Sequence, residues 1–92
     1  STVDRLENRI LLVWIEAPEG ESPYAVNGLD YEVQNALAFP ARGRLRTLGE
    51  RIAARQGSGT AVRVEVWKRT FDPATGESRR VLVAREAVPI AR

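Results

Sequence analysis

The sequence contains no histidine, no cysteine and no methionine. Histidine is the side chain that normally titrates near neutral pH, and cysteine is the strongest soft metal ligand and nucleophile. Their absence removes most catalytic constellations, the usual zinc sites and any disulfide framework. We therefore expect no enzymatic activity, no cofactor and no metal site.

The sequence also has little excess of either charge. It contains 14 basic and 12 acidic residues, which give a formal net charge of +2. Attraction to nucleic acid or anionic lipid over long distances should be mild. All basic residues but one are arginines. The lack of cysteine leaves the compartment open, with the cytoplasm favoured.

Long hydrophobic runs are missing as well, because the longest, Ile10 to Ile15, has six residues. A membrane-spanning helix needs about 20. The length of 92 residues predicts a single globular domain, 1–92, with one core. Because the chain opens at Ser1, excision from a longer polypeptide is consistent with it, and an extramembrane domain of a larger membrane protein is one functional hypothesis.

The first half of the chain predicts a strand followed by two helices. Residues 9–16 carry apolar side chains at both odd and even positions, as in a strand that is covered on both faces. Residues 17–28, with two prolines and two glycines, predict a loop. Helices are expected over 30–38 and 40–56, divided at Pro40. The second helix carries an apolar stripe of Ala41, Leu45, Leu48 and Ile52.

The second half predicts a β-hairpin. Val62, Val64 and Val66 alternate with polar or aromatic residues, residues 72–76 have turn chemistry, and residues 80–88 return as a strand. Pairing Asp72 with Glu77 sets a register that is expected to place Trp67 opposite Leu82 and Arg63 opposite Glu86. The other face of the hairpin should carry the valines, namely Val62, Val64, Val66, Val81 and Val83.

These elements give an α+β fold of order β-α-α-β-β, with one small three-stranded sheet and a helical layer on one face. The first strand is expected at an edge. It would run parallel to the second strand after a right-handed crossover, or antiparallel to the third. The sequence leaves that choice open.

A sheet with one helical layer exposes its second face, and apolar side chains there predict a partner. The leading hypothesis is therefore a non-enzymatic protein-interaction or assembly module, a homodimer or a binder of another protein. In this hypothesis the partner contacts the exposed sheet face and pairs with the first strand, which lies at the edge of the sheet. The alternative is that the 17–28 loop covers this face through Tyr24 and Val26. The expected interface residues are Trp14, Trp67, Phe71 and Leu82.

Arginines along the second helix support a different function, nucleic-acid binding, because guanidinium groups bind phosphates in pairs of hydrogen bonds. The same residues also suit an ordinary amphipathic helix that solvates its edges. We rank this function below protein binding. The residues concerned are Arg42, Arg44, Arg46, Arg51 and Arg55.

The remaining polar motifs favour structural roles. Asp30 is expected to cap a helix, with Glu32 in its first turn. Glu19 and Glu21 lie in the predicted loop, with no second element to make them converge on a ligand. The Gly57 to Thr60 segment follows a helix and precedes a strand, the reverse of a phosphate-binding loop, and predicts a helix stop.

Overall fold

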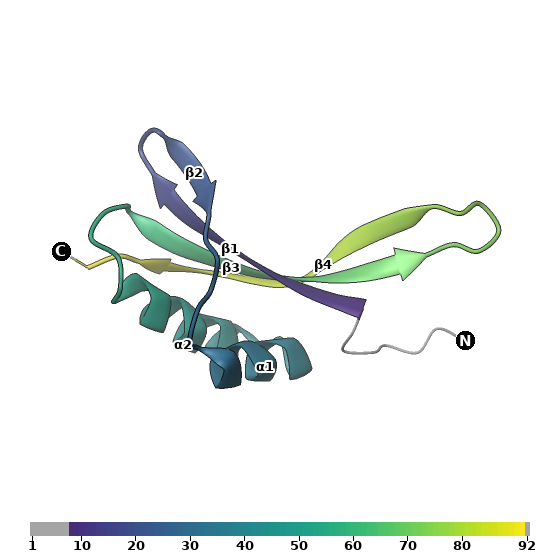
Figure 1. Cartoon of the computed structure of the whole chain (residues 1–92), viewed down its shortest axis with the longest axis horizontal. Coiled ribbons are helices and arrows are strands. Elements are labelled where there is room, and N and C mark those ends of the chain that lie inside the picture. Colours follow the sequence, from purple (N-terminus) through teal and green to yellow (C-terminus); the bar gives the residue numbers. More distant parts are fainter. Residues whose placement is uncertain (1–7, 92) are drawn as a thin grey trace.

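A computed structural model describes residues 8–91 and contains a four-stranded antiparallel sheet with two helices on one face (Figure 1). The α+β class, the two helices and the C-terminal hairpin are as predicted. The sheet, however, has four strands rather than three. The elements in chain order are β1 (Arg9–Ala17), β2 (Gly20–Pro23), α1 (Asp30–Ala38), α2 (Arg42–Ala53), β3 (Ala61–Phe71) and β4 (Ser78–Pro89).

The additional strand, β2, lies inside the segment predicted as a loop. Ala17 pairs with Gly20, so a two-residue turn of Pro18 and Glu19 reverses the chain. Gly20 has a φ of +135°, which residues with a side chain rarely adopt, and this allows pairing to resume at once. All four β2 residues are exposed. The strand therefore lacks the alternating pattern by which sequence reveals strands.

The strand order is β2-β1-β3-β4, so β1 is an interior strand and the expectation of an edge was wrong. Because β2 turns the chain back before the helices begin, β3 starts beside the end of β1, with Ala61 opposite Glu16. The pairing is therefore antiparallel, which corrects both arrangements considered for the first strand. The edges are the short β2 and the long β4.

The core lies between the sheet and the helices. Leu45, Leu48 and Ile52 of α2 are fully buried against Val62, Val64 and Val66 of β3. Ala41, expected on the same stripe, is exposed, because the helix begins at Arg42, two residues later than predicted. α1 has the predicted bounds, but its N-cap residue is Leu29 rather than Asp30.

The β3–β4 hairpin has the predicted register at its turn and not at its base. The Asp72 amide donates to the Glu77 carbonyl at 2.9 Å, and Trp67 lies opposite Leu82. A β-bulge at Val66 and Trp67 then shifts the register by one residue, so that Arg63 faces Ala87 and not Glu86.

The outer part of this hairpin, residues 68–82, extends beyond the helical layer, and we call it the arm (Figure 1). Val81 and Val83 were predicted to join the buried valine face. They are 53% and 43% exposed, because Val81 lies in the arm, past the helices, and Val83 is the extra residue of the bulge. Two-stranded hairpins alone are marginally stable in water, so the arm is poorly supported within one chain.

Gly49 sets how closely α2 approaches the sheet. A Cβ atom at this position would lie 2.8 Å from Cγ2 of Val88, whereas a Cβ at Gly43 of the same helix would meet nothing within 4 Å. The contact between α2 and the sheet therefore needs glycine at 49 and not at 43.

We predict opposite effects for alanine at these two positions. Gly49→Ala should lower the free energy of unfolding by about 1–3 kcal/mol, because the helix must move off Val88. Gly43→Ala should raise it by roughly 0.5–1 kcal/mol through helix propensity. Urea unfolding of both variants gives the two values. Equal effects would mean that the close approach of α2 does not limit packing.

Candidate functional site

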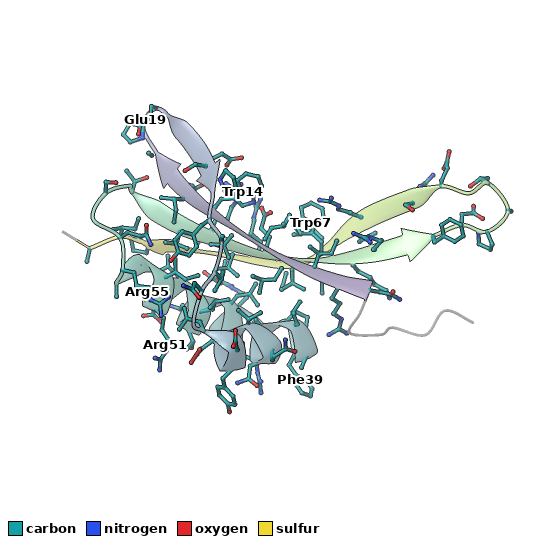
Figure 2. The ribbon with its side chains drawn as sticks, viewed as in Figure 1. Trp14, Glu19, Phe39, Arg51, Arg55 and Trp67 are labelled. Atoms are coloured by element: carbon teal, nitrogen blue, oxygen red, sulfur yellow. The ribbon has the colours of Figure 1, made fainter. Side chains whose placement is uncertain are left out.

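The sheet face opposite the helices carries Trp14 and Trp67 (Figure 2) and is built around one buried carboxylate, that of Glu65. Glu65 Oε1 accepts a hydrogen bond from Trp14 Nε1 at 3.1 Å and another from Trp67 Nε1 at 3.0 Å. Strand alternation on β1 and β3 puts all three side chains on this face. Glu65 is only 6% exposed although no helix covers it, whereas both tryptophans are partly exposed. The two indoles are therefore held in fixed positions by a common acceptor.

We call this surface the tryptophan face. Its central residues come from three strands and are Ile10, Leu12, Trp14, Glu16, Arg63, Glu65, Trp67, Leu82 and Arg85. Tyr24 and Val26 pack instead against the core on the helical side. The proposed cover of this face by the 17–28 segment through those two residues was therefore wrong.

Arg63 joins three strands at one end of the tryptophan face. Its guanidinium contacts Glu16 of β1 at 2.7 Å, Glu21 of β2 at 2.7 Å and Glu65 of β3 at 2.9 Å. It also lies over the Trp14 ring, 5.6 Å from the centroid. Glu16 and Glu21 are directly opposite each other across the strands, so Arg63 offsets their mutual repulsion.

These contacts shift two pKa values. Burial alone would raise the pKa of Glu65, but the hydrogen bonds from Trp67, Trp14 and Arg63 outweigh it and lower that pKa below its ordinary value. Burial would lower the pKa of Arg63, and its bonds to Glu21, Glu65 and Glu16 raise it instead. Both groups therefore stay charged, and the cluster is suited to holding side chains in place rather than to proton transfer.

Phe71 and Leu82 lie in the arm and continue the tryptophan face along it. Leu82 is the cross-strand partner of Trp67, and Phe71 lies four residues further along β3, at the same parity. Their exposed fractions are 40% for Leu82 and 64% for Phe71. All four residues predicted at an interface, Trp14, Trp67, Phe71 and Leu82, thus lie on one face.

The five arginines predicted as a nucleic-acid surface each have a partner within the chain. Arg42 contacts Glu86 at 2.9 Å, an interaction that raises the Arg42 pKa, and Arg46 lies 3.9 Å from the same carboxylate. The other partners are Glu32 for Arg51, the Asn27 carbonyl for Arg55 and the Phe39 ring for Arg44. Nucleic-acid binding stays a prediction, but these contacts leave no uninterrupted basic stripe on α2.

Sequence reasoning did not single out Glu65 or Arg63 as functional candidates. The signal was the spacing of Arg63, Glu65 and Trp67 on alternate residues of one strand, which places them on the same face. Their joint role appears only once the register places Trp14 and Glu16 beside them.

Other site types find little support in residues 8–91. That stretch holds no group of three or more acidic side chains placed to bind a metal ion, and neither of its helices is long and apolar enough to cross a membrane. Protein-family models, curated proteins and solved structures give no match to this chain. No family relationship therefore bears on the role of the tryptophan face.

We predict that Glu65→Gln destabilises the fold by about 1–3 kcal/mol. An amide oxygen can replace Oε1 toward both indoles, but the amide nitrogen then faces the Arg63 donor. The opposite orientation leaves both indole N–H groups without an acceptor. Glu77→Gln, at an exposed carboxylate in the arm, is the control and should change stability little. Urea unfolding followed by tryptophan fluorescence measures both.

The pH dependence of the Glu65 contribution follows from its lowered pKa. A carboxylate whose pKa is lower in the folded state stabilises fully above its unfolded pKa of about 4.3 and loses this contribution as the pH falls through the folded value. The stability difference between wild type and Glu65→Gln should therefore be constant near neutral pH and shrink below about pH 4.3. A difference that widens in acid would contradict the assignment.

Proposed function

We propose that this chain is a non-enzymatic protein-interaction module whose binding surface is the tryptophan face together with the apolar side chains of the arm. The observation that carries the proposal is the pair of partly exposed indoles fixed by Glu65 on the face that no helix covers. Aromatic anchors that are rigid before binding lose little conformational entropy when a partner covers them.

The arm adds a second argument. Phe71 and Leu82 are 64% and 40% exposed on the tryptophan face of one two-stranded hairpin, and Val81 and Val83, at 53% and 43%, add exposed apolar surface to the same hairpin. Grouped apolar exposure of this kind is typical of surfaces that another protein covers. The long edge strand β4 borders the same region and offers backbone groups for strand pairing.

Because β1 is an interior strand, the sheet edge proposed to pair with a partner is β4. β2 pairs with β1 over Trp14–Ala17 only, so the second half of β1 is closed to strand addition, and the long free edge of β4 takes its place in the proposal. Trp67 is also a poor residue with which to test binding, because replacing it removes a hydrogen bond to buried Glu65. Phe71 and Leu82 are better test positions, since both are exposed.

A photo-crosslinking residue, p-benzoyl-phenylalanine, tests the proposal when it replaces Phe71 or, as the matched control, Phe39. The two phenylalanines are 64% and 63% exposed, but Phe39 lies at the end of α1, on the helical side (Figure 2). In cells, discrete protein adducts should form from position 71 and be lost on addition of Leu82→Asp. Adducts identified by mass spectrometry with this chain or with another protein both agree with the proposal. Equal labelling from position 39, or no adduct from position 71, contradicts it.

A further inference from the structure

Each end of the tryptophan face carries a like-charged cross-strand pair, while Glu65 and its cross-strand neighbour Arg85 lie between the two ends. At one end, Glu16 and Glu21 are direct cross-strand neighbours with Arg63 between them. At the other end, Arg69 and Arg80 are direct cross-strand neighbours at the same parity as Trp67 and Leu82. Like charges directly opposite each other in a sheet destabilise it unless an opposite charge lies close. Only the acidic pair has such a charge within the described chain.

The basic pair is arranged to accept a carboxylate. Arg69, Arg79 and Arg80 line an open pocket of about 310 Å³ with Ser78, and neither Arg69 nor Arg80 has an ion pair with a carboxylate of residues 8–91. Among the carboxylates of residues 8–91, Arg79 contacts only Glu77, at 3.6 Å. A carboxylate in this pocket would offset the repulsion between Arg69 and Arg80, as Arg63 offsets that between Glu16 and Glu21.

Glu19 is the acidic residue of this chain best placed to supply that carboxylate from another copy. It lies at the tip of the β1–β2 turn, exposed, and forms no ion pair within residues 8–91 (Figure 2). The β1–β2 hairpin and the arm stand at opposite ends of the sheet, and both bend away from the helices (Figure 1). Within one chain, Glu19 and the arm cannot meet.

We infer that the partner of the tryptophan face is a second copy of this chain, in a two-fold dimer that seats Glu19 of each copy between Arg69 and Arg80 of the other. This inference rests on the proposed function. A two-fold axis that crosses the strands above Trp67 exchanges the two ends, so each acidic tip meets a basic arm and the assembly closes. The apolar residues Ile10, Leu12 and Leu82 and the two tryptophans then face their counterparts.

The tryptophan face runs along the 50 Å long axis of the molecule. A stable interface buries about 800 Å² on each partner. The fixed indoles supply the central anchors, and the two sites formed by Glu19 and the arm set the orientation.

The test uses two variants that each break the proposed contact from one side. Arg69→Glu/Arg80→Glu replaces one like-charged cross-strand pair by another, so the strain within the arm is matched. Glu19→Arg changes only an exposed turn residue. Each variant alone should raise the dissociation constant of self-association by about tenfold or more, because both symmetry-related contacts become repulsive. Glu50→Arg, at an exposed carboxylate of α2, is the control and should leave it unchanged.

Mixing the two variants is the decisive measurement. In a mixed dimer, the arginine introduced at the β1–β2 turn of one copy meets the two glutamates introduced in the arm of the other. The second contact of that dimer is wild type, so association should return to within a few-fold of the wild-type constant. Sedimentation equilibrium at low and high salt, with circular dichroism as a check on folding, gives the masses and constants. A heterodimer that weakens with salt is the expected result.

Other outcomes would overturn the dimer. A wild-type chain that is monomeric throughout excludes it, and adducts from position 71 with other proteins would then still support the interaction function. Loss of association in the arm variant alone would mean that a group other than Glu19 occupies the pocket. Assemblies larger than a dimer on mixing would indicate head-to-tail growth rather than two-fold closure.

Discussion

The hydrogen bonds to Glu65 are the interaction on which the tryptophan face depends. A carboxylate in the middle of a sheet face without helical cover would ordinarily be solvated by water, yet here two indole N–H groups and Arg63 replace that water. The exchange is favourable because a charged acceptor strengthens each hydrogen bond and because the two indole N–H groups would otherwise lack partners as the rings pack down. The indoles in turn shield the carboxylate. The side chains of this face are therefore held in place by a buried polar group under two aromatic rings, whereas those of the helical side are held by apolar packing.

The helical side is ordered by close packing instead. Three valines of β3 meet three aliphatic residues of α2, and Gly49 lets the helix approach within contact of Val88. The helical layer ends before the arm begins (Figure 1). Beyond that point, within residues 8–91, β3 and β4 pair only with each other, and both their apolar and their like-charged side chains are exposed. The two faces and the arm are consequences of one arrangement, a hairpin that is longer than the helices that cover it.

Features that depend on local pattern were predictable from the sequence. The α1 bounds, the α2 core positions Leu45, Leu48 and Ile52, and the pairing of Trp67 with Leu82 all follow from periodicity and turn chemistry. β2 was missed because its four exposed residues carry no hydrophobic alternation. The bulge and the strand order were missed because they depend on which distant residues pair. Placing Arg63, Glu65 and Trp67 on one face needs only their spacing, whereas their contacts with Trp14, Glu16 and Glu21 require the order β2-β1-β3.

Net charge conceals the electrostatic character of this chain. A value of +2 for 92 residues describes an almost neutral molecule, but the sheet separates a pair of carboxylates from a pair of guanidinium groups along its long axis. The repulsion within the acidic pair is offset locally because β3 presents Arg63 between β1 and β2. Within residues 8–91, β1 begins at Arg9, opposite Lys68, and β4 is the outer strand, so no described strand lies beside Arg69 and Arg80. An uncompensated pair on an edge hairpin is stabilised most readily by a group from outside the chain, so the position of β4 in the sheet is what links this fold to association.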